Sequence, residues 1–154
     1  MTATILVIDD EPDVRILCKV NLEFEGYRVV EAWDGEMGLE MVKTEKPDLI
    51  LLDLMMPTLG GWDVMQQLKE DPETASIPIV LLTAKADEAS QLRGWEEGVL
   101  DYVTKPFNPM SLAKYVEAAL ESRDSPDEER RRDQIVDKLR RIRGLRRPVD
   151  GGVG

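Results

Sequence analysis

Asp53 follows directly after Leu49-Ile-Leu-Leu52, a fully apolar run without polar alternation. Such a run is typical of a strand that is buried on both faces of a parallel sheet. A carboxylate at the end of that strand is costly when it is buried alone, so it needs a cation or a polar cleft. Because ligands of open α/β sheets bind beyond the carboxyl ends of the strands, Asp53 is a candidate site residue.

A second group of acids has the same relation to an apolar run. Asp9, Asp10 and Glu11 come directly after the run over residues 4–8. Carboxylates that converge raise one another's pKa, and a hard divalent cation such as magnesium relieves the repulsion through oxygen ligands. We interpret Asp10 and Asp53 as metal ligands. For Glu11 we prefer the alternative that it favours the N-terminal dipole of the following helix.

Two further polar groups end later apolar runs. Thr83 closes the run over residues 79–83, and Lys105 follows the short run at residues 102–103. Each would be an ordinary strand-end residue alone. Together with Asp53 and a metal, a hydroxyl and an ammonium are the parts that hold a phosphoryl group on an aspartate.

The elements that must position these groups alternate regularly along the chain. The strands are predicted at residues 4–8, 27–32, 49–52, 79–83 and 102–103. Helices are predicted from Pro12, from Asp34-Gly35, over about 62–70, over roughly 87–97 and after Asn108. This alternation predicts an α/β fold, a doubly wound five-stranded parallel sheet of flavodoxin-like order 2-1-3-4-5. The most apolar strands take the central places.

Four motifs in this order and spacing carry a family resemblance. They are Ile8-Asp-Asp-Glu11, Asp53-Leu-Met-Met-Pro57, Leu82-Thr-Ala84 and Asp101-Tyr-Val-Thr-Lys-Pro-Phe107. Over about residues 4–122 the chain resembles the receiver domain of bacterial two-component response regulators. The resemblance implies a phosphorelay regulator, a phosphoprotein that is no enzyme beyond catalysing its own aspartyl phosphorylation and dephosphorylation.

The same resemblance implies roles for single residues. Asp53 would accept a phosphoryl group from a phosphohistidine, with Lys105 paired to that group. Thr83 would turn toward it, and Tyr102 would move inward as the second switch residue. Asp10, Asp53 and the backbone carbonyl of Met55 would bind Mg²⁺, with Asp9 helping indirectly. The bond between Lys105 and Pro106 would be cis.

Some positions depart from the family pattern or tune it. Gly60 stands where the family often has an acid, and Val99-Leu100 replace its common Ala-Asp. Both changes should alter partner contacts and leave the chemistry alone. Met55 and Lys85 stand where the family tunes phosphoryl lifetime, and a bulky Met55 should shield the phosphoryl group and slow its loss.

Partners and location follow from charge, cysteine count and the resemblance. Residues 1–123 hold 24 acidic and 11 basic residues, a net charge of −13, so direct nucleic-acid binding is not expected. The expected partners are a sensor histidine kinase or phosphotransfer protein and a downstream protein partner. A phosphorylation-dependent homodimer would use the predicted elements at 87–97, at 102–103 and after Asn108. One cysteine and no span long enough for a bilayer favour a cytoplasmic protein without membrane contact.

Residues 124–154 read as a separate extension of the receiver domain at 1–123. Ile135, Leu139 and Ile142 give a thin apolar stripe in a charged helix, and the end after Gly144 is expected to be disordered. We expect this segment to be a solvated helix and not a dimerisation helix.

Two other functional classes use a doubly wound sheet of this kind: an aspartyl-phosphate phosphohydrolase and a flavodoxin-like flavin carrier. A magnesium-dependent aspartyl-phosphate phosphohydrolase would want an acid where Met55 stands, and Asp9 and Asp10 would repel a flavin phosphate.

Overall fold

The computed structural model describes residues 2–84, 93, 96 and 101–122 of the 154-residue chain. For Thr83 and Tyr102 it describes the backbone alone. Lys85, most of the helix predicted over 87–97 and the extension 124–154 lie outside the described residues. The elements in chain order are β1 (Thr4–Ile8), α1 (Pro12–Phe24), β2 (Arg28–Ala32), α2 (Gly35–Glu45), β3 (Leu49–Leu52), α3 (Gly61–Glu70), β4 (Ile79–Thr83), β5 (Asp101–Thr104) and α5 (Pro109–Ser122).

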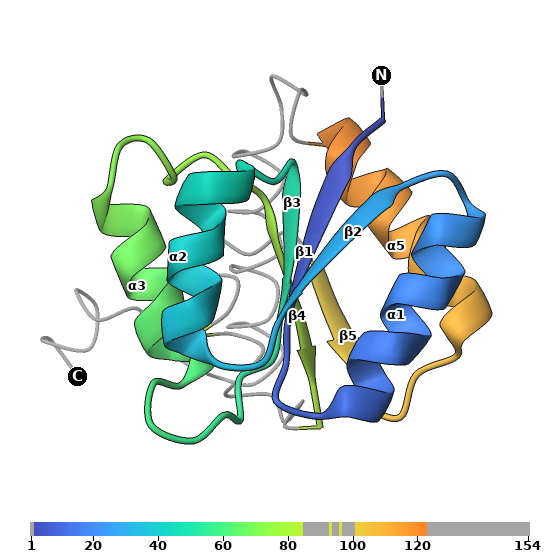
Figure 1. Cartoon of the computed structure of the whole chain (residues 1–154), viewed down its shortest axis with the longest axis horizontal. Helices are drawn as coiled ribbons and strands as arrows, with labels where there is room; N and C mark the ends of the chain where they lie inside the picture. The colour runs from blue at the N-terminus through green and yellow to red at the C-terminus, as the bar shows by residue number, and fades with distance from the viewer. Residues whose placement is uncertain (1, 85–92, 94–95, 97–100, 123–154) are drawn as a thin grey trace, which may run out of the picture.

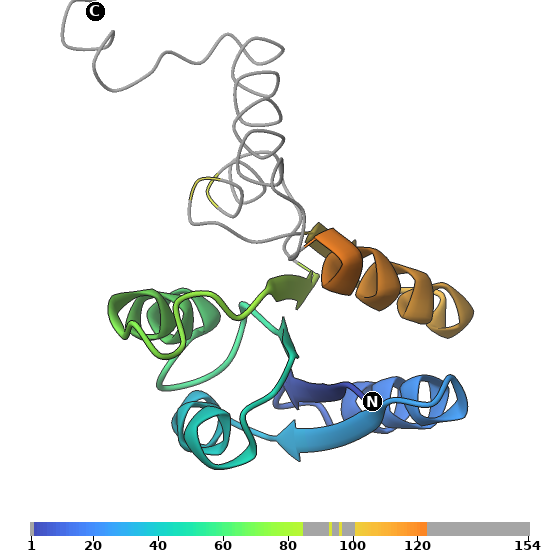
Figure 2. The ribbon, with the colours of Figure 1, turned by 90° about the horizontal axis from the view of Figure 1, so that it is seen from above.

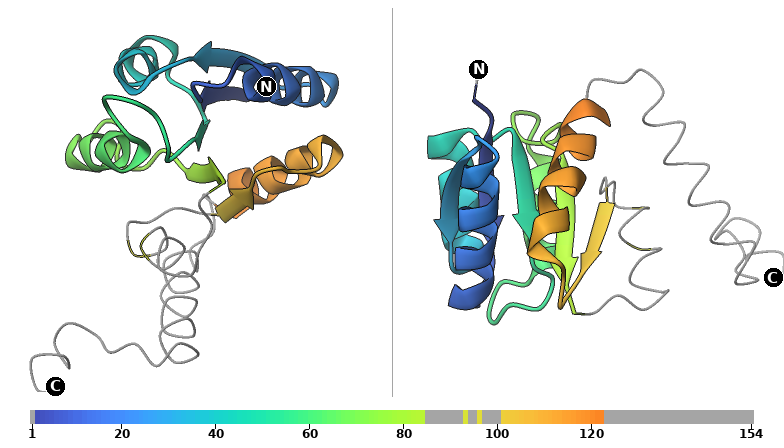
Figure 3. Two further views of the ribbon diagram at one scale, coloured as in Figure 1. Left: turned by 90° about the horizontal axis from the view of Figure 1, so that it is seen from below. Right: turned by 90° about the vertical axis from the view of Figure 1, so that its right-hand side faces the viewer.

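The five strands form one parallel sheet in the order β2-β1-β3-β4-β5, which confirms the predicted topology. α1 and α5 lie together on one face of the sheet, and α2 and α3 lie on the other (Figures 1 and 2). Figure 3 shows the same layers from two more sides. The fold is therefore the flavodoxin-like α/β sandwich that the alternating pattern predicts.

Two hydrophobic clusters hold the layers together because successive side chains of a strand point to opposite faces. Leu6, Ile50 and Leu81 face α2 and α3, whereas Ile5 and Leu51 face α1 and α5. Every residue of β3 is buried, as are four of the five in β1. The central strands read as unbroken apolar runs because both of their faces are covered.

The helices begin where capping chemistry predicts them to begin. Pro12 opens α1, and Asp34 accepts a hydrogen bond of 2.7 Å from the backbone N–H of Met37 at the start of α2. Gly26 follows α1 with φ of 96°, the left-handed conformation that glycine adopts at no steric cost. Within α1 the buried side chains are Cys18 and Leu22, whereas Leu17 is 42% exposed.

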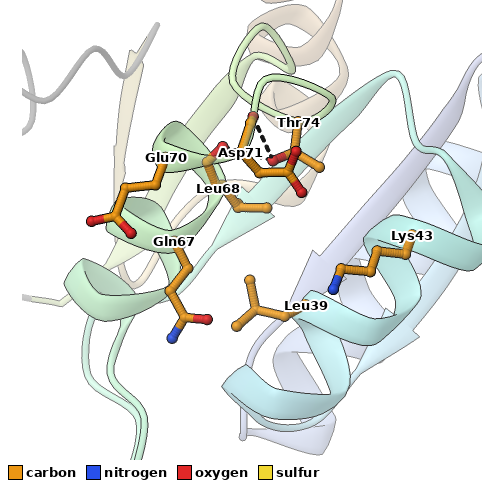
Figure 4. Close-up of a pocket in the computed structure, with 7 residues that line it drawn as sticks. All are labelled: Leu39, Lys43, Gln67, Leu68, Glu70, Asp71 and Thr74. Carbon is orange, nitrogen blue, oxygen red and sulfur yellow. Dashed lines mark hydrogen bonds between the residues drawn. The ribbon is translucent and has the colours of Figure 1, made fainter.

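A hollow of about 290 Å³ lies between α2 and α3 (Figure 4). Its lining includes Lys43 near the end of α2 and Thr74 in the segment after α3. Both helices run antiparallel to the strands, so the carboxyl-terminal end of each helix lies at the amino end of the sheet. This hollow is therefore at the far end of the molecule from the acids that follow β1 and β3.

Candidate functional site

The register of the sheet brings the acids together. Ile8 at the end of β1 pairs with Leu52 at the end of β3, so Asp9 and Asp53 leave the sheet side by side. The backbone N–H of Asp53 donates to the Ile8 carbonyl over 2.9 Å. The backbone N–H of Asp9 donates to the carbonyl of Ala32 at the end of β2 over 3.1 Å. These backbone hydrogen bonds fix the positions from which the side chains of Asp9 and Asp53 leave the sheet.

Lys105 brings the one positive charge of this group from the segment that follows β5. Its Nζ lies 2.7 Å from Asp9 Oδ2, 2.9 Å from Glu11 Oε1 and 3.5 Å from Asp53 Oδ2. The bond between Lys105 and Pro106 is cis, as predicted. One ammonium therefore serves three carboxylates that come from two different strands.

Local backbone hydrogen bonds orient the two buried carboxylates. The N–H of Glu11 donates to Asp9 Oδ1 over 2.9 Å, and the N–H of Met55 donates to Asp53 Oδ1 over 3.1 Å. In each case the donor lies two residues after the aspartate, which is the geometry of an Asx turn. One oxygen of each carboxylate is thus tied to its own loop, and the other is directed toward Lys105.

Burial raises the pKa of Asp53 to about 6, and the negative charge of Asp9 adds to this effect. The N–H of Met55 and the charge of Lys105 oppose the rise without cancelling it. Burial also raises the pKa of Asp9, in spite of its contact with Lys105. For Lys105, burial favours the neutral form, but contacts with Asp9 and Glu11 outweigh burial and raise its pKa above the usual range.

The donor chemistry of this group fits a hard divalent cation. Carboxylate oxygens of Asp9, Asp10, Glu11 and Asp53 all lie within 4.8 Å of one another. Asp9 Oδ2 is buried, and its partner within the described part of the chain is the Lys105 ammonium at 2.7 Å. Four acids that converge around the ammonium of Lys105 are a set of oxygen donors that a hard divalent cation would fit.

The interpretation of Glu11 as a simple dipole acid is incomplete. Glu11 stands at the N-cap position of α1, but its side chain makes no capping hydrogen bond and instead contacts Lys105. Sequence reasoning also missed Arg15, whose Nη1 donates to the Asp9 carbonyl oxygen over 2.7 Å. Arg15 lies one helical turn after Glu11, so helical spacing could have placed both residues at this edge.

For two of the other predicted site residues, Thr83 and Tyr102, the structure describes the backbone position alone. The backbone of Thr83 ends β4 opposite Thr104 of β5, and Tyr102 lies in the strand opposite Leu81. Thr83 is therefore at the same edge as the acids. Met55 has an exposed fraction of 59%. The predicted switch and lifetime roles of these residues stay predictions.

Comparison with known proteins decides the family. A family model for the response regulator receiver domain matches residues 5–117. The chain belongs to the response regulator receiver domain family. The receiver fold also matches solved structures: the Vibrio cholerae chemotaxis protein CheY4 is 27% identical, with a TM-score of 0.73 over 77% of this chain and 99% of that one. A response regulator structure from Chloroflexus aurantiacus is 31% identical, with a TM-score of 0.74 over 79% and 99% of the two chains.

Curated relatives of this receiver include regulators of transcription. The alkaline phosphatase synthesis transcriptional regulatory protein PhoP of Bacillus subtilis is 42% identical over 90% of this chain and 58% of its own length. The DNA-binding dual master transcriptional regulator RpaA of Synechocystis is 38% identical over 87% of this chain and 56% of its own length. The chain thus spans little more than half of these relatives.

The expectation that direct nucleic-acid binding is absent is therefore wrong. It rested on the net charge of residues 1–123, and RpaA is named as DNA-binding although this chain matches it closely. The physical reason is that the charge of one domain does not constrain a separate domain of the same protein. Within the described residues, no helix has the length and apolar character needed to cross a membrane.

Proposed function

We propose that Asp53 accepts a phosphoryl group and that this event switches the receiver. The observation that carries the proposal is the contact group itself: Asp53 is 2% exposed, Lys105 Nζ lies 3.5 Å from its Oδ2, and Asp9 lies beside it. Asp53 Oδ1 is held by the N–H of Met55, which leaves Oδ2 as the atom to bond phosphorus. A pKa raised to about 6 still leaves Asp53 mostly ionised at neutral pH.

We propose Mg²⁺ as the cofactor, held by Asp10, Asp53 and the Met55 carbonyl, with Asp9 acting indirectly. When bound, the ion would neutralise charge on the transferring phosphoryl group. Lys105 would neutralise charge from the other side, and Asp9 would keep the lysine in reach through its 2.7 Å contact. On this proposal the protein modifies its own aspartate and no other substrate.

The proposed donor is the phosphohistidine of a sensor kinase or phosphotransfer protein, since the chain has no histidine of its own. The added charge of about −1.5 to −2 and its acceptor oxygens would draw in Lys105 and Thr83, and Tyr102 would then turn inward. The receiver domain would span residues 1–123, and a cytoplasmic location is part of the proposal. We propose control of transcription as the output, because the relatives PhoP and RpaA are named as transcriptional regulators.

Intact mass spectrometry after incubation with phosphoramidate and Mg²⁺ tests the proposal. We expect wild type to gain one phosphoryl group and Asp53→Asn to gain none. Asp63→Asn, which removes an exposed acid from α3, is the matched control and should label like wild type. Equal labelling of Asp53→Asn and wild type, or full labelling in excess chelator, would contradict the proposal.

A further inference from the structure

The contacts of Lys105 are unequal, and its ammonium lies nearer to two flanking acids than to the proposed phosphoacceptor. Nζ lies 2.7 Å from Asp9 and 2.9 Å from Glu11, but 3.5 Å from Asp53. The lysine side chain is 10% exposed, so its carboxylate partners and not water hold most of its charge. In this state Lys105 is therefore bound by two acids that flank the acceptor.

The two flanking acids differ in kind. Asp9 is fully buried and its backbone is fixed in the sheet edge, whereas the side chain of Glu11 is 59% exposed. Within the described residues the Glu11 carboxylate makes no other hydrogen bond or ion pair besides that with Lys105. The pair is open to water on the Glu11 side, so it is weaker than the buried contact between Lys105 and Asp9, and it can open.

We propose that Glu11 is a positioning residue that competes with the phosphoryl group for Lys105 and thereby slows phosphoryl uptake by Asp53. This inference rests on the proposed function. To bond a group on Asp53 Oδ2, Lys105 Nζ has to move closer than its present 3.5 Å, and its 2.9 Å contact with Glu11 resists that movement. A carboxylate at the mouth of the site that holds the lysine back raises the barrier to uptake, and a neutral amide in its place lowers it.

The covalent step that the test follows is simple. Asp53 Oδ2 forms a bond to the phosphorus of phosphoramidate as the P–N bond breaks. The nitrogen of the donor is already protonated and leaves with the bonding electron pair as ammonia. No oxidant or further reactant is needed, so a change in rate between variants reports on the groups around Asp53.

Glu11→Gln is the test variant, and Asp13→Asn is its control. Each variant removes one negative charge from the first turn of α1 or the residue before it, but Asp13 is exposed and makes no contact with Lys105. Phosphorylation by phosphoramidate with Mg²⁺ is followed by intact mass at low and at high salt. Removal of the ion pair that competes for Lys105 should speed phosphorylation of Glu11→Gln by about two- to fivefold at low salt. Part of this gain should remain at high salt, because the two side chains are in direct contact at 2.9 Å.

The control separates competition from simple charge repulsion of the donor. Asp13→Asn should stay within about 1.5-fold of wild type, because screening at high salt removes long-range steering. An equal gain in both variants that disappears at high salt would overturn the proposal, as would slower uptake by Glu11→Gln. If wild type itself takes up no phosphoryl group, the proposed function fails and this inference fails with it.

A second measurement does not depend on phosphorylation. Pulse acylation of lysines without Mg²⁺ or donor, read by peptide mass spectrometry, reports how firmly Lys105 is held, with Lys69 as the internal reference. We expect Lys105 to react at least about twice as fast in Glu11→Gln as in wild type, and Asp13→Asn to match wild type. An unchanged Lys105 rate in Glu11→Gln would overturn the inference and leave the proposed function standing.

Discussion

The two ends of the sheet treat buried polar groups in opposite ways. At the carboxyl end, Asp9 and Asp53 are buried, and both share the ammonium of Lys105 with Glu11. At the amino end, the Oγ1 of Thr74 is buried and donates to the Leu68 carbonyl over 2.6 Å. The N–H of Thr4 likewise donates to Asp48 over 2.7 Å at that end.

The difference lies in how the buried polar groups of the two ends are paired. The amino end pairs its buried donors and acceptors, so little free energy is gained there by adding a ligand. The carboxyl end holds two buried acids, Asp9 and Asp53, beside the ammonium of Lys105. That arrangement costs free energy of folding, and a cation with oxygen ligands would relieve it.

The largest expected effect tests how tightly the loop after Asp53 is packed. A Cβ at Gly61 would lie 2.5 Å from the Asp53 carbonyl oxygen and 2.7 Å from the Leu54 Cα, and both are backbone atoms that cannot yield cheaply. Gly61→Ala should lower the free energy of unfolding by about 3 kcal/mol and slow phosphorylation, since it moves the acceptor. Urea unfolding with the mass assay measures both.

The neighbouring glycine is the matched control. A Cβ at Gly60 would meet nothing closer than the Leu54 carbonyl oxygen at 3.6 Å, and its φ of −76° suits any residue. Gly60→Ala should change the free energy of unfolding by less than about 1 kcal/mol. Equal losses in the two variants would mean that close packing against Asp53 is not the cause.

The cost of burying Asp53 predicts a pH dependence. Because burial raises its pKa from the ordinary 3.8 to about 6, the folded protein keeps a proton that the unfolded chain releases. This residue therefore contributes stability at low pH that is lost as pH rises from about 4 through 6. Without metal, Asp53→Asn should gain about 2 to 3 kcal/mol over wild type between pH 4 and pH 7.

Urea unfolding of both proteins across that pH range measures this gain. Added Mg²⁺ should stabilise wild type and leave Asp53→Asn nearly unchanged. A stability difference that stays constant from pH 4 to pH 7 would show that Asp53 is ionised without cost, and the contrast between the two ends of the sheet would then fail.

Thr74 tests the amino end in the same way. Thr74→Val keeps the shape of the side chain but removes the hydroxyl that serves the Leu68 and Asp71 carbonyl oxygens. We expect a loss of about 1 to 2 kcal/mol in urea unfolding, with phosphorylation by phosphoramidate unchanged. A change in phosphorylation rate would mean that the two ends of the sheet are coupled.

The smallest expected change in stability is at Asp34. This acid also lies at the carboxyl edge of the sheet, but its role there is to cap a helix. Its side chain caps α2 through the N–H of Met37, so Asp34→Ala should cost about 1 kcal/mol in thermal unfolding. Asp34→Asn keeps the cap and should remain close to wild type. A large loss in Asp34→Asn would assign the effect to charge and not to capping.

The sequence was sufficient to predict most of the fold because its apolar pattern agrees with the position of each strand in the sheet. The runs at 4–8 and 49–52 carry no polar alternation, and a strand covered on both faces is the arrangement that satisfies them. The polar strand at Arg28–Ala32 takes the edge. Placing Asp9 and Asp53 at the same edge then follows from parallel strands, and needs no knowledge of side-chain contacts.

The sequence by itself determined the sheet order, the family and the acids that gather at one edge, because periodicity and strand ends are local properties of the chain. Only the tertiary structure decided that Lys105 rests nearer Asp9 and Glu11 than Asp53. Glu11 and Lys105 are 94 residues apart, and a contact over that distance depends on sheet register and on the path of the loop after β5. Packing fixes both of these only once the whole domain has folded.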